Sequence, residues 1–233
     1  MDEPFAPKTG LIVGVGPGLS AALARRLSRA GVRLVLAARE IGKLEELCAE
    51  TGAEAVTCDA TDREMVEALF RTVDDHLGPL DLCVYNAGLR LRGPVPELDP
   101  AAVERALAVN AFGAFLVAQQ AVRRMLPRGR GCLLFTGATA SLEGRAHSAP
   151  FAMGKFALRG LAQALARELH PQGVHVVHLV IDGRIRRPGE GPGEPPDSTL
   201  DPADVAETAW HLVSQPRSAW SDEIVLRPWV EPF

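Results

Sequence analysis

The sequence predicts a single α/β domain built on a doubly wound parallel sheet. Short apolar runs alternate with amphipathic segments along all 233 residues, as expected when strands and helices alternate around a parallel sheet. Hydrophobic residues make up 47% and charged residues 23% of the chain, which is typical of a globular protein with a sizeable core. These proportions exclude a largely disordered chain.

Four strands and three helices are predicted in the first half of the chain. The strands are continuous apolar runs, as in sheets buried on both faces, and fall at residues 11–15, 34–36, 55–57 and 80–85. The first helix carries Leu19, Leu23, Leu27 and Ala30 on one face and stops at Gly31. The next two helices are expected at residues 41–50 and 62–77, with Thr61 or Asp62 as the N-cap of the latter.

The second half continues the alternation and contains one compositional break. Helices are predicted at residues 103–125, 150–170 and 202–214, and strands at residues 132–136, 174–181 and 223–226. Residues 187–197 are rich in Pro and Gly, which excludes helix and strand. We therefore expect one domain over residues 1–233, with a mobile loop at about residues 184–200 above the ligand-binding ends of the strands.

Composition also narrows the partners and the compartment. The net charge is -4 and no long basic run occurs, so nucleic acid is not expected as a partner. No apolar stretch is expected to reach the ~18–20 residues of a membrane span, and the start MDEPFAPK lacks the pattern of a secretory signal. The four cysteines form no C-x-x-C pair, which favours reduced thiols in the cytoplasm.

A glycine-rich segment follows the first predicted strand and opens the first helix. It contains Gly14, Gly16 and Gly18, followed by Leu19 and Ser20. Glycines at this place let backbone N–H groups approach a pyrophosphate at the positive end of a helix. The alternative is an ordinary glycine-rich turn, but the strand–loop–helix context favours a dinucleotide site.

Several motifs in order make the chain similar to the short-chain dehydrogenase/reductase family. Val13, Gly14, Gly18 and Ser20 fall on that family's T-G-x-x-x-G-x-G, with two of the four places changed. Residues 59–62 resemble its adenine-contacting acidic segment, residues 85–88 its N-N-A-G, residues 109–110 its helix asparagine, and residues 151–155 its Y-x-x-x-K. The resemblance implies a Rossmann-type three-layer α/β/α sandwich that binds a nicotinamide cofactor through Gly14, Gly16, Gly18, Leu19, Asp59, Ala60, Asn86, Ala87, Gly88 and Lys155.

The end of the second strand indicates which cofactor is preferred. Ala38 stands where NAD-dependent members of the family carry an acid, and Arg39 follows it. A guanidinium suits a 2′-phosphate, whereas a carboxylate suits a 2′-hydroxyl. Glu40 could pair with Arg39 or bind a ribose hydroxyl itself, and both residues could also be solvated. We expect NADP(H) in preference to NAD(H).

Two of the family's four catalytic groups are replaced. The resemblance assigns the asparagine to Asn110 and the lysine to Lys155, but Phe151 stands at the tyrosine position and Ala138 at the serine position. Phenylalanine transfers no proton, and alanine donates no hydrogen bond to a developing alkoxide. General acid–base catalysis typically contributes ~10²–10⁴-fold and an oxyanion donor ~10²–10³-fold. Ordinary ketone reduction is therefore not expected.

Substitute proton donors are few. Tyr85, the single tyrosine, is expected to pack in the sheet. Hydroxyls or an imidazole could enter the pocket from Thr139, Ser141, Ser148 and His147, although we interpret each first as an ordinary loop or cap residue. Some dienoyl-CoA reductases of the family work without the tyrosine, so Lys155 could instead stabilise the enolate formed from a conjugated alkene. The three histidines at 170, 175 and 178 show no metal-ligand pattern, and no metal is expected.

Arginine clusters and apolar helices bear on the substrate and on assembly. Guanidinium groups at positions 90, 92, 184, 186 and 187 suit an anionic small-molecule substrate, although solvated surface charge explains them equally well. The family usually pairs through long helices, so residues 111–117 with Leu158 and Leu165 are expected to form a homodimer or homotetramer interface; core packing is the alternative.

Two functions remain open. One is an NADP(H)-binding oxidoreductase with an incomplete catalytic tetrad that acts on an activated carbonyl or a conjugated alkene. The other is a catalytically inactive pseudoenzyme that serves as a cofactor-binding sensor or an interaction subunit. Lys155, Asn110 and the glycines suit cofactor binding in both.

Overall fold

A seven-stranded parallel sheet forms the centre of the computed structural model, which describes residues 5–231. The strand order is β3-β2-β1-β4-β5-β6-β7, with every pairing parallel. The order changes direction between β1 and β4, and such a switch point opens a crevice at the carboxyl ends of the strands. The strands are β1 Thr9–Val13, β2 Arg33–Ala38, β3 Glu54–Thr57, β4 Leu82–Tyr85, β5 Gly131–Thr136, β6 Val174–Ile181 and β7 Glu223–Leu226.

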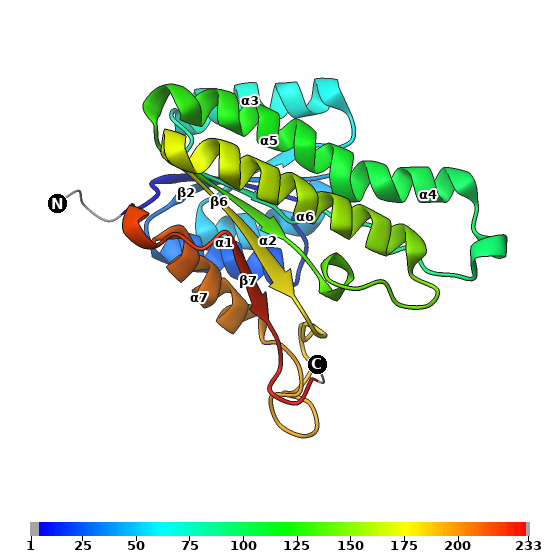
Figure 1. Ribbon diagram of the computed structural model, residues 1–233. Coiled ribbons are helices and arrows are strands. Elements are labelled where there is room, and N and C mark those ends of the chain that lie inside the picture. The colour runs from blue at the N-terminus through cyan, green and yellow to red at the C-terminus, as the bar shows by residue number, and fades with distance from the viewer. Residues whose placement is uncertain (1–4, 232–233) are drawn as a thin grey trace.

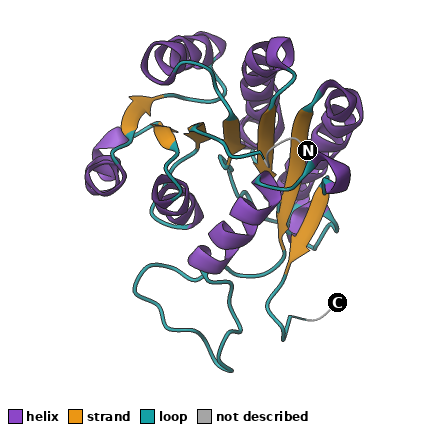
Figure 2. Cartoon of the chain, turned by 90° about the vertical axis from the view of Figure 1, so that its left-hand side faces the viewer, coloured by secondary structure: helices purple, strands orange, loops and turns teal. Residues whose placement is uncertain are grey.

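Helices cover both faces of the sheet (Figure 1, Figure 2), which confirms the three-layer α/β/α sandwich. One layer contains α1 Leu19–Arg29, α2 Glu45–Thr51 and α7 Pro202–Val213. The other contains α3 Arg63–Leu77, α5 Gly113–Met125 and α6 Ala149–Leu169. A further helix, α4 Pro100–Leu107, continues into α5 through a π-helical turn, Ala108–Phe112.

Two apolar clusters fill the spaces between the layers. Successive side chains of a strand point to opposite faces, so Leu11 and Val13 pack toward α3, α5 and α6 while Ile12 packs toward α1, α2 and α7. These side chains are buried, and each contributes about 1.5–3 kcal/mol by leaving water. The strands are therefore held in place from both sides.

Some element boundaries differ from the sequence prediction for local reasons. The first strand ends at Val13 rather than at residue 15, because Gly14 has a φ of +85° that no strand can continue. The long helix begins at Pro100 rather than at residue 103, because the Asp99 side chain accepts hydrogen bonds from the N–H groups of Ala101 and Ala102. Residues 41–44 form a 3₁₀ turn before α2. Asp62 caps α3 as predicted.

The stretch Pro100–Arg128 requires a correction. Among the described residues, this one helix is long and apolar enough to cross a membrane by length and composition, whereas no such stretch was expected. In the fold one face of this stretch packs on the core: Val117, Ala121 and Met125 lie in the cluster between the sheet and α3, α5 and α6. Residues 1–4, which begin the segment read as lacking a signal, lie outside the described range.

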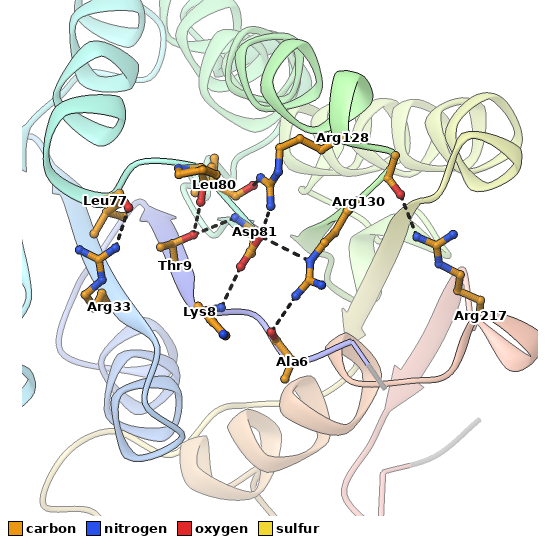
Figure 3. Close-up of polar contacts among 12 residues, drawn as sticks. Ala6, Lys8, Thr9, Arg33, Leu77, Leu80, Asp81, Arg128, Arg130 and Arg217 are labelled. Carbon is orange, nitrogen blue, oxygen red and sulfur yellow. Dashed lines mark hydrogen bonds and ion pairs between the residues drawn. The ribbon is translucent and has the colours of Figure 1, made fainter. Parts of the chain in front are cut away.

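The amino ends of the strands are joined by a polar network around Asp81 (Figure 3). The Asp81 carboxylate, only 5% exposed, accepts hydrogen bonds from the backbone N–H of Lys8 (2.9 Å) and from the guanidinium of Arg128 (2.5 Å), and Arg130 lies 3.7 Å away. Arg128 also donates to the carbonyl of Leu80. Each charge in this network therefore has an opposite charge beside it.

Candidate functional site

A cavity of about 990 Å³, here called the glycine cavity, lies at the carboxyl ends of β1 and β2. Residues 14–18 line it, and no side chain caps the N-terminus of α1. A Cβ atom placed on Gly16 or Gly18 would meet nothing within 4 Å, so both glycines face the open cavity. The unpaired backbone N–H groups of the first helical turn, together with the helix dipole, make this a site for an anion.

Gly14 has a different reason to be glycine. Its φ is +85°, and a Cβ there would lie 2.3 Å from the backbone nitrogen of Ala87. The Asn86 amide donates to the carbonyl of Gly14 (3.1 Å) and accepts from the hydroxyl of Thr136 (3.1 Å). These contacts hold the carboxyl ends of β1, β4 and β5 together beside the cavity.

The far end of the glycine cavity, after β2 and β3, carries both signs of charge. Arg39 and Lys43 line it, and Glu40 forms an ion pair with Lys43. Glu40 therefore does not neutralise Arg39 by an ion pair, which was one of the two alternatives for it. The Asp59 carboxylate accepts hydrogen bonds from the N–H (2.9 Å) and the hydroxyl (2.7 Å) of Thr61, and the first of these chiefly lowers the pKa of Asp59.

A second cavity of about 670 Å³, the lysine cavity, adjoins the first at the carboxyl ends of β4, β5 and β6. Lys155 of α6 lines it although its side chain is only 5% exposed. Its ammonium donates to the carbonyl of Thr136 (2.8 Å), and burial lowers the pKa of Lys155 to about 8. Because an ammonium has three donors, two N–H groups remain available to a ligand.

Phe151 precedes Lys155 by one turn of α6, and both line the lysine cavity. The Lys155 ammonium lies 5.9 Å from the centre of the Phe151 ring, so a cation–π contact takes the place of a hydrogen bond. Ala138, which follows β5, lines the same cavity and presents only a methyl group. The wall opposite the ammonium therefore contains no proton donor at positions 138 and 151.

The neighbouring hydroxyls are mostly engaged with the protein. Ser148 lines the lysine cavity but donates to the carbonyl of Arg145 (2.6 Å). Ser141 is fully buried and accepts from the N–H of Ala138. Thr139 lines the cavity and hydrogen-bonds Asp182. Tyr85 is 1% exposed and donates to the carbonyl of Val109 (2.6 Å), which is the packing role expected for it.

Asn110 acts on the loop that follows β4. It is fully buried in the π-helical turn, and its amide donates to the carbonyl of Leu89 (2.8 Å) and accepts from the N–H of the same residue (3.1 Å). The turn also packs closely against α6, since a Cβ on Gly154 would lie 2.6 Å from the Cβ of Asn110. Asn110 therefore positions the loop that begins at Gly88.

Most of the predicted site residues come together. Those predicted to bind the cofactor line the glycine cavity, except Lys155, which lines the lysine cavity: Gly14, Gly16, Gly18, Leu19, Arg39, Asp59, Ala60, Asn86, Ala87 and Gly88. The two cavities share Leu19, Asn86, Gly88, Ile185 and Arg187. Within the Pro/Gly-rich loop, residues 183–188 line one or both cavities, whereas residues 189–197 line neither.

Some lining residues were not anticipated from the sequence. Arg145 and Glu231 line the lysine cavity, Lys43 lines the glycine cavity, and the Thr136 carbonyl holds Lys155. No motif contains the first three. Thr136 alone could have been placed at the site from the sequence. It is the last residue of the predicted fifth strand, and the carboxyl ends of parallel strands meet at the edge where ligands bind.

The comparison with family models decides the family. The model described as short chain dehydrogenase matches residues 8–183, which include both cavities' strand ends and Lys155. The chain belongs to this short-chain dehydrogenase family. The seven-stranded parallel sheet with helices on both faces agrees with that membership.

Known relatives show how far the likeness extends. The 3-oxoacyl-acyl-carrier-protein reductase MabA of Mycobacterium tuberculosis is 32% identical over 78% of this chain and 71% of its own length. Glycine betaine reductase ATRR of Emericella nidulans is 30% identical over 99% of this chain, which spans only 19% of that longer protein.

Solved structures give the same picture. A short-chain dehydrogenase from Rhodopseudomonas palustris superposes with a TM-score of 0.84 at 33% identity, covering 95% of this chain and 98% of that one. An alcohol dehydrogenase from Thermococcus sibiricus, complexed with 5-hydroxy-NADP, gives a TM-score of 0.86 at 26% identity, covering 97% and 98%.

Proposed function

We propose that the protein binds NADP(H) in the glycine cavity and reduces an activated carbonyl or a conjugated alkene in the lysine cavity. The observation that carries this proposal is the junction of the two cavities, where Asn86 and Gly88 line both and Lys155 lies beside them. A cofactor held along the first cavity would present its reactive end to a substrate in the second. The family and its NADP-complexed member from Thermococcus sibiricus support the cofactor assignment.

The residues of the glycine cavity fit a dinucleotide phosphate. Gly16 and Gly18 leave room for a pyrophosphate at the uncapped start of α1. Arg39 and Lys43 supply cations at the end where a 2′-phosphate would lie. Glu40, which pairs with Lys43, does not cancel both charges. This arrangement favours NADP(H) over NAD(H).

Lys155 provides the polar chemistry of the lysine cavity. When bound, the cofactor supplies a hydride. The two free N–H groups of Lys155 can then hydrogen-bond the oxygen on which negative charge develops, because the third N–H is fixed on Thr136. A conjugated alkene suits this pocket better than a simple ketone, since its enolate can take its proton at carbon from water, whereas the alkoxide formed from a ketone needs a proton donor placed at its oxygen. Phe151 and Ala138 stand beside it as apolar walls.

The alternative is a pseudoenzyme that binds the cofactor without turnover. The specific observation that favours it is that Phe151 and Ala138 line the lysine cavity at the two positions where the family carries tyrosine and serine. A cofactor-binding sensor or interaction subunit would need the glycine cavity alone.

The deciding experiment has two stages. Calorimetric titration with NADPH and with NADH tests the cofactor site, and micromolar binding with an NADPH preference is expected. Purified protein is then supplied with NADPH and a panel of aldehydes, ketones and enoyl thioesters. Oxidation of NADPH by enoyl thioesters or activated carbonyls supports the oxidoreductase. No turnover by the wild type, together with new activity in F151Y/A138S, supports the pseudoenzyme.

Pairing of two copies is proposed through the outer face of α5 and α6. Phe112, Phe115, Met153 and Phe156 are each between 43% and 52% exposed there, and the helices run side by side (Figure 1). Leu158 is fully buried and Leu165 packs on the core, so these two expected interface residues belong to the protein interior instead. The four thiols form no disulfide, which suits the cytoplasmic compartment expected for the protein.

A further inference from the structure

We propose that Arg90 and Arg92 bind an anionic group of the substrate, carried at the end remote from its reacting carbon. This inference rests on the proposed function, because it assigns a substrate class to the lysine cavity. Both arginines line that cavity together with Lys155 and Phe151. Both side chains are exposed, so an incoming ligand can reach them.

The charges around the lysine cavity do not cancel. Five arginines line it, at positions 90, 92, 145, 184 and 187, whereas its lining carboxylates are those of Glu143 and Glu231. Arg145 is paired with Glu143, and Arg184 with Glu190 of the adjoining loop. Within residues 5–231, the guanidinium groups of Arg90 and Arg92 have neither an ion pair nor a hydrogen bond. Among the described residues, the cavity therefore offers three guanidinium groups without an ion pair, those of Arg90, Arg92 and Arg187, in addition to Lys155, and one lining carboxylate without an ion pair, that of Glu231.

The segment that carries these two arginines is fixed at both ends. On one side, the Asn110 amide holds both backbone groups of Leu89. On the other side, the N–H of Gly93 donates to the carbonyl of His147 (2.9 Å), in the loop between β5 and α6. A solvated surface loop needs no such restraint. Fixing the backbone before the ligand arrives lowers the entropic cost of binding.

The distribution of polarity within the cavity indicates how the substrate lies. Ala138, Phe151 and Ile181 form apolar walls near Lys155, which suits a carbonyl or alkene carbon and its hydrocarbon chain. The guanidinium groups suit a planar oxyanion, a carboxylate or a phosphate, through charge-assisted hydrogen bonds. A compact oxo-acid and a phosphate-bearing thioester both carry an oxyanion that a guanidinium can bind. The experiment below distinguishes between these two sources of the anion.

The kinetic test uses matched substrates that share one reacting group. Succinic semialdehyde is compared with methyl 4-oxobutanoate, and crotonyl-CoA with S-crotonyl-N-acetylcysteamine, at saturating NADPH. We expect the anionic member of at least one pair to have the lower KM, and R90Q/R92Q to raise that KM about tenfold or more while leaving the neutral member unchanged. A preference confined to one pair identifies the source of the anion. Equal KM values within both pairs would overturn the proposal.

A binding test works without turnover and so separates this inference from the proposed function. Glutarate and coenzyme A are titrated calorimetrically into NADP⁺-loaded wild type, R90Q/R92Q and the control R29Q/R71Q, which removes the same charge from α1 and α3 outside both cavities. We expect the first variant to bind one of these anions about tenfold more weakly, with NADP⁺ affinity unchanged. Binding by neither anion, or an equal loss in the control, contradicts the proposal. If only R90Q/R92Q loses affinity for the anion and the wild type shows no turnover, the anion site is supported and the proposed reduction is not.

Discussion

The amino and carboxyl ends of the parallel strands differ in how their charged side chains are paired. At the amino ends, Asp81 is nearly buried and is surrounded by Arg128, Arg130 and a backbone N–H. At the carboxyl ends, Lys155 is equally buried but its ammonium contacts a carbonyl and the Phe151 ring rather than a carboxylate, and within the described residues Arg90 and Arg92 have no carboxylate partner. The buried carboxylate placed between two guanidinium groups at the amino end stabilises the fold. Incomplete pairing at the other leaves binding capacity for ligands, at a cost in stability.

The largest expected effect concerns the ligand end. Gly18→Glu introduces a carboxylate into the open space beside the start of α1, where it would oppose a phosphate. We expect the Kd for NADPH to rise at least about 100-fold, equivalent to about 2.7 kcal/mol, while the free energy of unfolding stays within about 0.5 kcal/mol of wild type. Calorimetry and urea unfolding measure the two quantities. Unchanged affinity would place the pyrophosphate elsewhere.

Removing charge at the amino end should act on stability alone. Asp81→Ala removes the carboxylate that accepts from Arg128 and from the Lys8 N–H and that pairs with Arg130, so that both arginines keep only backbone carbonyl partners. We expect the free energy of unfolding to fall by about 2 kcal/mol, moderated because both arginines can reach water. Urea denaturation checks this. The control is the affinity for NADPH, which should not change, and a fall in affinity as large as the fall in stability would remove the contrast between the two ends.

Removing the charge of Lys155 at the carboxyl end should raise the free energy of unfolding instead of lowering it. The pKa of Lys155 is lowered by burial to about 8 from 10.5. Below pH 8 the lysine is charged in both the folded and unfolded states, so burial of its charge destabilises the fold by about 3 kcal/mol. From pH 8 to 10.5 only the unfolded state keeps the proton, and this cost disappears as pH rises.

Lys155→Met should therefore be more stable than wild type at pH 7, by about 2 kcal/mol once the lost bond to Thr136 is deducted. The difference should shrink above pH 8, pass through zero at about pH 9.5 and favour the wild type by about 1 kcal/mol above pH 10.5. Denaturant unfolding of both proteins at a series of pH values isolates this group, since the other titrations cancel. A variant less stable than wild type throughout would contradict the comparison.

The smallest expected effect concerns cofactor choice. Arg39→Ser removes one of two cations at the far end of the glycine cavity. We expect the Kd for NADPH to rise about tenfold and that for NADH to stay unchanged. Lys43→Ser is the matched comparison, with a smaller loss because Glu40 already pairs with that lysine. Equal losses for both cofactors after Arg39→Ser would indicate an adenine contact rather than a phosphate contact.

The sequence predicted the sheet and most of the glycine cavity because these depend on local patterns. Apolar runs fix the strands, and glycines between a strand and a helix fix the loop. The start of α4 was missed because Asp99 and Pro100, an N-cap and a first-turn proline, lie outside the apolar periodicity. The role of Leu158 was left open between a subunit interface and the core, because a leucine stripe on a helix has the same pattern in both cases; the structure shows that it is buried in the core.

The long-range contacts of the candidate site could not be predicted. From the sequence, Glu40 could pair with Arg39 or with Lys43, because both cations lie within three residues of it. The backbone geometry after β2 places Lys43 beside the carboxylate, and this geometry is not visible in the sequence. The hydrogen bonds from Asn110 to Leu89 join residues 21 apart, and the π-helical turn that makes them possible has no composition of its own.

The close approach of α6 to the π-helical turn couples the residues that positions 110 and 154 can hold. A Cβ on Gly154 would lie 2.6 Å from the Cβ of Asn110, so a larger residue at 154 requires glycine at 110 or a shift of α6 away from the turn. The two sites are therefore expected to behave non-additively in a double-mutant cycle. Because every side chain except that of glycine begins with a Cβ, exchanging Asn110 for another side chain does not free position 154, and the separation between α6 and the turn itself requires glycine there.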